Sequence, residues 1–471
     1  MMTDNTANMI NNNNLMLNEL TDIKRFATDL HEGWIITSQY NDNPHYIVAC
    51  YSSKTQYAGH WVNDTTLLAR GLVLKLTDTG TRLYKNTANH YKTASIDDIA
   101  SMLDGAMVTA RGMRKFFTIQ AATTDWGAVK LVDDDENVTV ASNVNIDYNA
   151  PASVADKLDG ALGIGTIIDG DYIISTKGSF RSDEAMHGNE IMHTKHNSTG
   201  FADFMMANDL TGFTPLFEII TPNDFHVIQY GSMNDIVLLG LLHQRTGHWI
   251  PSALLDSDEL TTHTNAADIV HRFNFITPDV YNASTLDEAL ARPALDNHEG
   301  MVVTINNDGY HQDMFKIKYP AFLMLQRLKN NTSGKALKEL IRAMPTDAIM
   351  NADRDVITER LMDSLPGDAR MAAIPIISRL NDTAVSEYIN PIRDTVYAAL
   401  ALYASAVSGI DLSDTTDTGR LFASRVNTAS TTSTVRNVVY GLKRAVMSGT
   451  VVDDASMLNA AVNIAKRVIL K

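Results

Sequence analysis

Residues 156–163 have the sequence DKLDGALG, in which a lysine, one spacer, an aspartate and a glycine lead into an apolar run. A lysine in such a setting can act as a nucleophile, and an aspartate two residues later can reach a sugar hydroxyl or a metal-bound water. Gly160 lets the backbone turn tightly beneath a ligand. A solvated turn has the same composition, so the interpretation of Lys157 and Asp159 depends on the rest of the chain.

A second lysine follows a predicted β-hairpin. Residues 166–174 read TIIDGDYII, and the Asp-Gly pair between two apolar runs suits a two-residue turn. Lys177 closes the second strand in the sequence TKGS. Because the strands of a hairpin run back along one another, we expect Lys177 to return to the neighbourhood of Lys157. A solvent-exposed lysine at a strand end is the alternative.

Two glutamates stand in or next to apolar segments that predict strands. Glu218 lies within FTPLFEII, residues 213–220, where a charged side chain needs a partner or a function. Glu299 heads the predicted strand of residues 297–304. Both glutamates are therefore candidates for a functional site.

The sequence FKIK at residues 315–318 alternates apolar and basic residues. Such alternation places Lys316 and Lys318 on one face of a strand. Repulsion between the two cations favours a bound anion between them.

The N-terminal third predicts strands at residues 34–37, 45–51 and 67–74. Arg70 lies beside a glycine within the third strand. It could bind an anion, or it could be a surface arginine on an edge strand. Residues 111–117 read RGMRKFF; three cations beside two phenylalanines could stack a base and hold a phosphate, or the phenylalanines could belong to the core.

Composition sets the broad class. The chain has 471 residues, 45% hydrophobic and 20% charged, so two or three globular domains are expected. No apolar run is long enough for a membrane span, and no secretory signal is visible, which together with a single cysteine, Cys50, predicts a cytoplasmic protein. A net charge of −16 argues against an overall basic surface that coats nucleic acid and leaves room only for a local basic pocket.

Three further segments define the predicted domain organisation. The Asn-rich residues 1–14 predict a disordered lead-in. Residues 121–150 are polar, and their acidic run at 133–136 predicts a solvated loop between short strands. Residues 330–334 read NNTSG and predict a linker. Beyond them, Ala-rich helical periodicity predicts an all-helical domain over residues 335–471, with Asp453 capping the last helix.

The order KLDG, TKGS, FEIITPND, EGMVV and FKIK resembles the covalent nucleotidyltransferase superfamily of ATP-dependent ligases and capping enzymes. Within it, residues 45–322 are similar to the bacteriophage RNA ligase 1 family. The resemblance implies an α+β fold, in which a nucleotidyltransferase domain (15–329) has antiparallel sheets around an ATP pocket and precedes the helical domain (335–471).

The implied activity is ATP-dependent joining of 5′-phosphate and 3′-hydroxyl RNA ends in three steps, through a lysyl-AMP and an adenylylated RNA end. ATP and Mg²⁺ (or Mn²⁺) are the implied cofactors. The implied partners are single-stranded or nicked-loop RNA, including tRNA with a broken anticodon loop, and the implied context is RNA repair by a monomeric enzyme in a cell infected by a bacteriophage.

The resemblance also implies roles for individual residues. Lys157 matches the adenylylated nucleophile, and Glu299 matches the glutamate that places the metal, with Asp347 near a second metal-binding position. The family places a tyrosine where this chain has Phe322, which puts a hydroxyl-dependent role in doubt. The interval from Lys115 to Lys157 is longer than usual for the family, which suggests an inserted loop. Residues that match nucleotide contacts are Tyr51, Arg70, Lys115, Asp159, Lys177, Glu218, Lys316 and Lys318.

Two alternatives remain at this stage. A DNA ligase or a GTP-using capping enzyme would share the chemistry, but no oligonucleotide-binding β-barrel is recognisable after FKIK. A catalytically silent relative that only binds RNA ends would lack AMP transfer, although the charged residues expected for catalysis are present.

Overall fold

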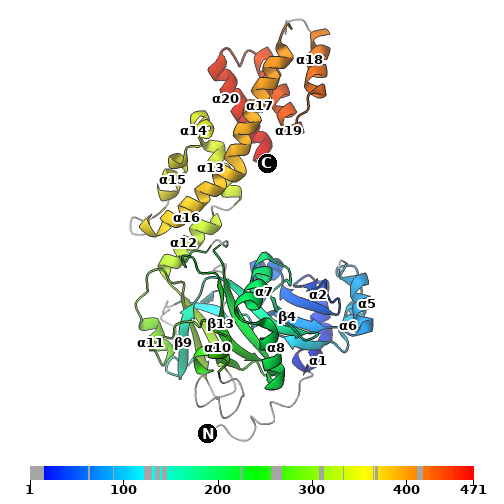
Figure 1. Cartoon of the computed structure of the whole chain (residues 1–471), viewed down its shortest axis with the longest axis vertical. Helices are drawn as coiled ribbons and strands as arrows, with labels where there is room; N and C mark the ends of the chain where they lie inside the picture. The colour runs from blue at the N-terminus through cyan, green and yellow to red at the C-terminus, as the bar shows by residue number, and fades with distance from the viewer. Residues whose placement is uncertain are drawn as a thin grey trace. The chain divides into compact units, whose positions relative to one another are not determined.

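Figure 1 shows the protein as a computed structural model. It describes residues 15–61, 64–88, 90–120, 130–132, 138–139, 146–222, 224, 226–255, 268–306, 312–331, 334–363, 365, 370–410 and 417–471. The predicted lead-in of residues 1–14 and the acidic run at 133–136 lie outside these ranges. The chain divides into two compact units, Met1–Phe322 and Leu323–Lys471.

The described strands of the first unit form three sheets. The first sheet is antiparallel, and helices α2 (Ile23–His31), α5 (Asp78–Thr87) and α6 (Ile96–Leu103) contribute to the hydrophobic cluster packed against it. Its strands, in spatial order, are β1 (Leu15–Met16), β5 (Met107–Ala110), β4 (Arg70–Lys75), β3 (Tyr46–Tyr51) and β2 (Ile35–Gln39).

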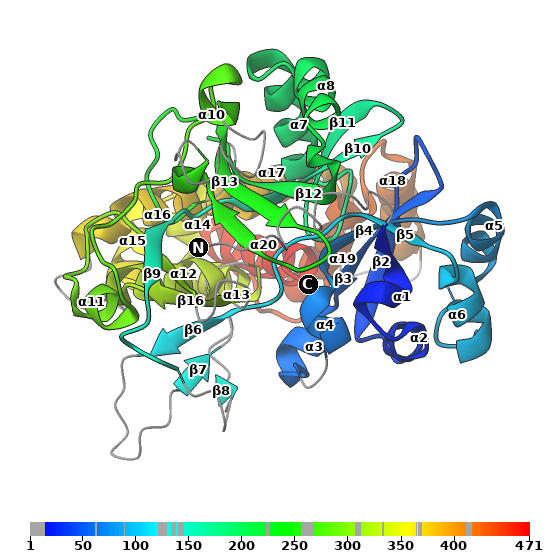
Figure 2. The same ribbon diagram turned by 90° about the horizontal axis from the view of Figure 1, so that it is seen from below.

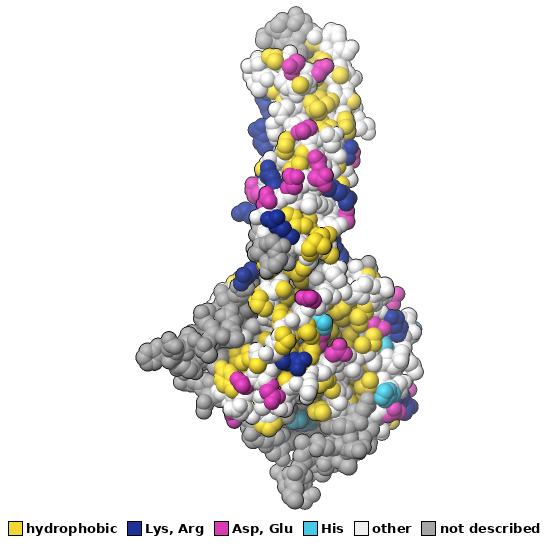
Figure 3. Space-filling view, turned by 90° about the vertical axis from the view of Figure 1, so that its left-hand side faces the viewer, with side chains coloured by type: hydrophobic (Ala, Val, Ile, Leu, Met, Phe, Trp, Pro, Cys, Tyr) yellow, Lys and Arg dark blue, Asp and Glu magenta, His cyan; other side chains and the backbone are white. Residues whose placement is uncertain are grey.

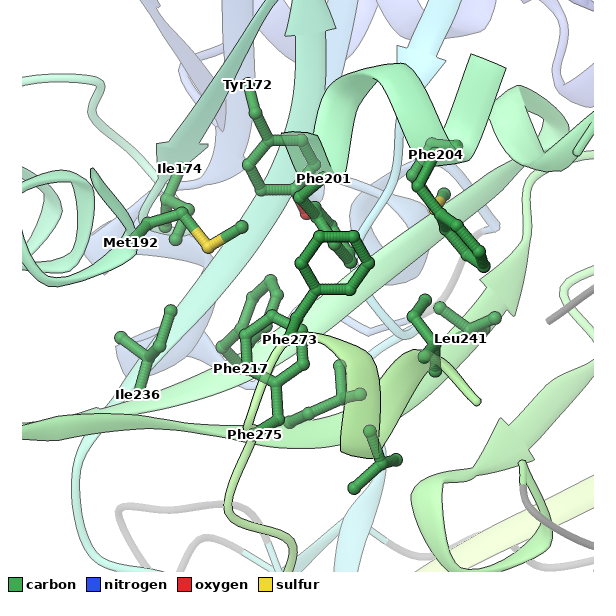
Figure 4. Packing of buried hydrophobic residues seen from close by; sticks show 14 of the residues in the cluster. Tyr172, Ile174, Met192, Phe201, Phe204, Phe217, Ile236, Leu241, Phe273 and Phe275 are labelled. Atoms are coloured by element: carbon green, nitrogen blue, oxygen red, sulfur yellow. The ribbon is translucent and has the colours of Figure 1, made fainter. Parts of the chain in front are cut away.

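The second sheet is also antiparallel and carries an aromatic core. Helices α7 (Asp183–Lys195) and α8 (Ser198–Ala207) cover one face, where aromatic rings including Phe201, Phe217 and Phe275 pack edge to face or tilted against one another (Figure 4). Its strands, in spatial order, are β11 (Asp171–Ser175), β10 (Ala161–Ile168), β12 (Phe213–Ile220), β13 (Asp235–His243) and β14 (Trp249–Pro251).

The third sheet contains the two lysines of FKIK. β16 pairs in parallel with β6 and antiparallel with β15, and β15 pairs antiparallel with β9. Figure 2 shows β6, β7 and β8 running outward on one side of this sheet. Its strands, in spatial order, are β8 (Val138–Thr139), β7 (Lys130–Val132), β6 (Phe117–Gln120), β16 (Gln312–Lys318), β15 (Gly300–Asn306) and β9 (Ala152–Lys157).

The first and second sheets share a hydrophobic cluster. Val48 and Val73 of the first sheet belong to the same buried cluster as Ile164, Leu216 and Leu242 of the second. This shared core fixes the two sheets to one another, so that residues at the ends of β3, β4 and β11 meet.

The described residues of the second unit after α12 (Pro320–Asn331) are helical, as the sequence predicts. Pro391 lies in the first turn of α17, which continues from a π-helical turn, and Asp453 caps α20 by accepting a hydrogen bond from Ser456 N. On the face shown in Figure 3, basic and acidic side chains are interspersed over this unit. Its helices are α13 (Lys335–Ala343), α14 (Thr346–Asn351), α15 (Arg354–Asp363), α16 (Arg370–Thr383), η4 (Ala384–Ile389), α17 (Asn390–Val407), α18 (Asp417–Thr428), α19 (Ser433–Met447) and α20 (Asp454–Ile469).

The expected fold class, α+β with antiparallel sheets followed by helices, is confirmed for the described residues. So is the hairpin of β10 and β11: Asp169 and Gly170 both have positive φ, 54° and 95°, as a two-residue turn of this kind requires. None of the described helices has the length and apolar character of a membrane span.

Two local predictions were wrong. Leu67 and Leu68, predicted to begin a strand, end helix α4 (Asp64–Leu68), and β4 begins only at Arg70. The first two residues of the predicted linker belong to α12.

The aromatic core of the second sheet makes a direct stability prediction. Phe217 is fully buried among aromatic rings, so Phe217→Ala should lower the free energy of unfolding by about 3–5 kcal/mol. Urea unfolding followed by circular dichroism measures this loss. Met186→Ala on α7 is the control, because that side chain is 52% exposed and should cost well under about 1 kcal/mol. Equal losses in the two variants would contradict the assignment of this cluster as core.

Candidate active site

A buried carboxylate joins two lysines at one end of the third sheet. Glu299, directly before β15, is 3% exposed. Its Oε2 lies 2.8 Å from Lys157 Nζ and its Oε1 lies 3.1 Å from Lys318 Nζ. The side chains of Lys157 and Lys318 are 18% and 6% exposed, so the three charges are largely withdrawn from water.

Strand register produces this arrangement. Gly300 lies opposite Lys157 of β9 on one side and opposite Lys318 of β16 on the other. The residue before Gly300 is therefore level with both lysines. Gly300 has a φ of 150°, and a Cβ there would overlap the carbonyl oxygen of Ile317, so only glycine suits this close approach of strands.

The segment after Lys157 is held by hydrogen bonds from other strands and loops. Gly160 N donates to Glu218 Oε1 (2.8 Å), and Asp159 N donates to Tyr230 Oη (2.7 Å). Asp159 Oδ2 in turn accepts hydrogen bonds from Val227 N (2.6 Å) and Ile228 N (3.3 Å). A Cβ at Gly160 would lie 2.6 Å from the carbonyl oxygen of Ile219, so this turn also requires glycine.

The surroundings of Glu218 shift the pKa of its carboxyl group. Burial raises the pKa of Glu218 to about 7; the positive charge of Lys157 and the hydrogen bond from Gly160 oppose this rise, whereas the nearby carboxylates Glu299 and Asp159 add to it. Glu218 therefore belongs to the same electrostatic environment as the Lys157–Glu299 ion pair.

Aromatic rings and cations form a second group beside the first. Lys177 Nζ lies 5.1 Å from the centre of the Tyr51 ring, and Lys115 Nζ lies 5.6 Å from Tyr51 and 5.2 Å from Trp61. Tyr51 and Trp61 pack edge to face, with ring centres 4.9 Å apart. Lys115 is only 5% exposed, so its charge is held against ring faces rather than in bulk water.

Arg70 belongs to this second group. Burial raises the pKa of the Cys50 thiol to about 11, and the positive charges of Lys177, Arg70 and Lys115 act in the opposite direction, which places all three cations around one buried side chain. Arg70 Nη1 is buried without a hydrogen-bond partner among the described residues. A buried guanidinium nitrogen in this state is suited to an anionic ligand.

Phe116 connects the two groups. Its ring centre lies 5.4 Å from Arg70 Cζ and 4.9 Å from Lys316 Nζ. Lys316 lies two residues before Lys318 on β16. The alternation of FKIK therefore places one lysine at the Glu299 ion pairs and the other beside the aromatic group.

These contacts bring together the predicted site residues of the first unit, which are Tyr51, Arg70, Lys115, Lys157, Asp159, Lys177, Glu218, Glu299, Lys316 and Lys318. Asp347 is not among them. It lies exposed in the first turn of α14 in the second unit, and its role in metal binding stays a prediction.

One interpretation of the sequence needs correction. Of the three cations in RGMRKFF, only Lys115 joins the site: Arg111 is buried and donates from Nη1 to the carbonyl of Gln244 (2.8 Å), and Arg114 pairs with Asp64 at the surface. Lys318 pairs with Glu299, and a bound anion between the two lysines of FKIK stays a prediction.

Phe322 is buried, and its ring centre lies 5.3 Å from Lys318 Nζ. Trp61 and Tyr230 were not predicted, because no spacing in the sequence marks either as part of a site.

The resemblance implies a divalent cation. The described residues fit such an ion only if a bound ligand supplies further donor atoms. No group of three or more His, Cys, Asp or Glu side chains suited to a metal ion occurs within the described part of the chain. Mg²⁺ in nucleotide enzymes is commonly held by one or two carboxylates plus substrate phosphates. Glu299, the carboxylate nearest Lys157, suits that sparse kind of donor set.

Comparison with known proteins identifies the class of enzyme. A family model described as RNA ligase matches residues 68–321, more than half of the chain. The protein belongs to the RNA ligase family, which confirms the resemblance seen in the sequence and the expectation that it is an enzyme.

Solved structures with weak similarity include three ligases. A Naegleria gruberi RNA ligase variant with ATP and Mn is 15% identical (TM-score 0.29); the match covers 38% of this chain and about half (52%) of that one. An archaeal ATP-dependent RNA ligase is 12% identical (TM-score 0.30; 58% and 70% covered). A putative ATP-dependent DNA ligase from Aquifex aeolicus is 11% identical (TM-score 0.29; 70% and 76% covered).

The pKa of Glu218 predicts how stability depends on pH. Because the folded-state pKa lies near 7, above the ordinary value of 4.5, the stability contributed by protonated Glu218 is fully present below about pH 4.5 and is lost as pH rises through 7. Glu218→Gln keeps an oxygen acceptor for Gly160 N but cannot ionise. Its unfolding free energy should therefore fall less between pH 5 and pH 8 than that of the wild type, by on the order of 2 kcal/mol.

Urea unfolding at both pH values measures this difference. The exposed Glu190→Gln on α7 should leave the pH dependence as in the wild type. If Glu218→Gln also left it unchanged, the carboxylate would not be held in the environment described above.

Proposed function

We propose that the protein is an ATP-dependent RNA ligase that joins 5′-phosphate and 3′-hydroxyl ends through a lysyl-AMP intermediate on Lys157. The observation that carries the proposal is the buried Glu299 carboxylate, which holds Lys157 and Lys318 together at the end of the third sheet. Lys157, Lys316 and Lys318 bring three ammonium groups to this end of the sheet, in a region that is shielded from water. A polyphosphate is the complementary ligand.

In the first step, Lys157 Nζ attacks the α-phosphorus of ATP. A phosphorus–nitrogen bond forms, the bond to the β-phosphate oxygen breaks, pyrophosphate leaves with that electron pair, and the amine gives up a proton to water. Glu299 Oε2 lies within hydrogen-bond distance of this amine and so orients it. A free lysine with a pKa of about 10.4 is mostly protonated at neutral pH, so the site has to favour release of that proton.

Cations around the phosphates provide the electrostatic part of catalysis, because negative charge in phosphoryl transfer is carried on oxygens. Lys318 and Lys316 are the proposed contacts of the α-phosphate, and their position on β16 next to the Lys157 ion pair supports this. The unpaired Arg70 Nη1 supports a role in binding an anionic group. Tyr51 supplies an aromatic face for the base, with Lys115 and Lys177 beside it, and Asp159 and Glu218 complete the nucleotide pocket at the turn after Lys157.

A divalent ion, Mg²⁺ or Mn²⁺, would be held by Glu299 together with the phosphates of ATP. Metal binding by Asp347 of the second unit is a separate proposal. When bound, such an ion neutralises developing charge on the phosphate oxygens.

The second and third steps transfer AMP to the RNA 5′-phosphate and then join the 3′-hydroxyl to that phosphate with release of AMP. The proposed substrate is single-stranded or nicked-loop RNA, including cleaved tRNA, and the helical domain (335–471) is the proposed determinant of that choice. We further propose a monomeric, cytoplasmic repair enzyme that is encoded by a bacteriophage.

The first prediction concerns the covalent intermediate. Incubation with ATP labelled at the α-phosphate and a divalent metal should attach the label to the wild-type protein, and Lys157→Ala should abolish labelling, because no other amine replaces the nucleophile. Lys24→Ala is the control, since the side chain of Lys24 is 78% exposed. Persistent labelling of Lys157→Ala would refute the proposed nucleophile.

A second prediction separates the proposal from a DNA ligase or capping enzyme. Sealing should occur with ATP and an RNA that has 5′-phosphate and 3′-hydroxyl ends, and should be at least about 100-fold slower with GTP or with nicked duplex DNA. Gel electrophoresis of labelled strands measures the rates. Comparable rates on DNA would favour the DNA ligase alternative, and RNA binding without any AMP transfer would favour a catalytically silent relative.

A further inference from the structure

The loop of residues 226–230, between β12 and β13, makes hydrogen bonds to both segments that carry the Lys157–Glu299 ion pair. On the Lys157 side, Tyr230 Oη accepts a hydrogen bond from Asp159 N (2.7 Å). The amides of Val227 and Ile228 donate in return to Asp159 Oδ2 (2.6 and 3.3 Å). Three hydrogen bonds therefore fasten the backbone and side chain of the second residue after Lys157 to this loop.

On the Glu299 side, the contact runs through Asn297. Gln229 N donates to Asn297 Oδ1 (2.8 Å), and Asn297 Nδ2 donates to the carbonyl oxygen of Gln229 (3.1 Å). The asparagine side chain thus satisfies both backbone groups of one loop residue. Asn297 has a left-handed backbone (φ 56°), a conformation that asparagine tolerates better than most residues.

These bonds lie where the sheet itself no longer holds the two segments together. The pairing of β9 with β15 ends at Lys157 opposite Gly300. Asp159 lies two residues after Lys157, and Asn297 lies two residues before Glu299. No strand pairing joins Asp159 to Asn297. The loop replaces the ladder at this point, so the two ends of the ion pair are tied to a common element.

The loop is itself anchored. Val227 and Ile228 are buried (4% and 8% exposed), and the His226 and Tyr230 rings pack edge to face with centres 5.7 Å apart. A buried loop can hold a fixed position, which a solvated one could not.

We propose that Tyr230 and Asn297 are positioning residues for formation of the lysyl-AMP: acting through Asp159 and Glu299, they fix where the Lys157 amine stands relative to the α-phosphorus. This inference rests on the proposed function and adds to it two residues that do not themselves contact the nucleotide. Small displacements of a nucleophile slow a reaction strongly, whereas ATP binding depends on the cations and aromatic rings described above.

Tyr230→Phe tests the Lys157 side, because it removes only the hydroxyl that accepts from Asp159 N. The maximal rate of lysyl-AMP formation in a single turnover should fall roughly 10- to 100-fold. The ATP concentration that gives half the maximal rate should stay within about twofold of the wild type. Joining of RNA that already carries AMP on its 5′-phosphate does not use the Lys157 amine as a nucleophile and should proceed at close to the wild-type rate.

Asn297 offers a graded pair of variants. Asn297→Gly removes both bonds to Gln229 but keeps the left-handed backbone accessible, and should slow the same step as Tyr230→Phe. Asn297→Asp keeps the acceptor for Gln229 N and should restore part of the rate. Tyr84→Phe is the matched control: Tyr84 is buried and its hydroxyl lies 3.1 Å from Thr37 Oγ1, in the first sheet, so its loss should leave the rate of lysyl-AMP formation unchanged.

The outcomes distinguish this inference from the proposed function. If the wild-type protein forms no lysyl-AMP, the proposed function fails whatever the variants do. If the wild type is labelled and both Tyr230→Phe and Asn297→Gly, folded by circular dichroism, keep its rate, the positioning role alone is wrong. A loss confined to ATP affinity, or an equal loss in the joining of pre-adenylylated RNA, also overturns it, because either result indicates a binding or global defect. Should Tyr230→Phe fail to fold, the comparison of Asn297→Gly with Asn297→Asp decides.

Discussion

Charge balance at one buried carboxylate is the constraint on which the site depends. Placing Glu299 and two lysines away from water is costly, and the cost is offset only when the geometry is good and the charges are paired. Here two ammonium groups pair with one carboxylate. The register of three strands at Gly300 brings Lys157 and Lys318 to Glu299, and the phosphates of the proposed ATP would meet the positive charge of these lysines.

The three sheets bring further side chains to this ion-paired group. The hydrophobic cluster shared by the first and second sheets brings the ends of β3, β4 and β11 together, and with them Tyr51, Arg70 and Lys177. Phe116 then joins this group to Lys316 on the third sheet through two cation–ring contacts. The first sheet thus contributes an aromatic face and Arg70, and the second and third sheets contribute carboxylates and lysines.

Much of this arrangement follows from local sequence patterns. The alternation of FKIK, the Asp-Gly turn and the Asp453 cap each depend on residues a few positions apart, and the structure has all three. The bond from Asp159 to Tyr230 and the pairing of Lys157 with Glu299 join residues about 70 and 140 positions apart, so no local pattern encodes them. The ordered motifs of the family placed Lys157 and Glu299 in one site by resemblance, but Tyr230, Trp61 and Asn297 had no such guide. At the end of α12 the local pattern was misleading. Asn330 and Asn331 favour a turn by composition, but they continue the helix that begins at Pro320.

The distribution of charge also bears on how an acidic protein can handle RNA. With a net charge of −16, the molecule as a whole repels a polyanion, and the face in Figure 3 carries both signs over the helical unit rather than a basic stripe. Around the site, six cations (Lys157, Lys316, Lys318, Lys177, Lys115 and Arg70) face three carboxylates (Asp159, Glu218 and Glu299). Exposed charges are screened within about 10 Å at ordinary ionic strength, whereas partly buried ones are screened much less. Attraction for phosphate is therefore strongest among these partly buried cations, which accords with the proposed binding of ATP and of an RNA 5′-phosphate there.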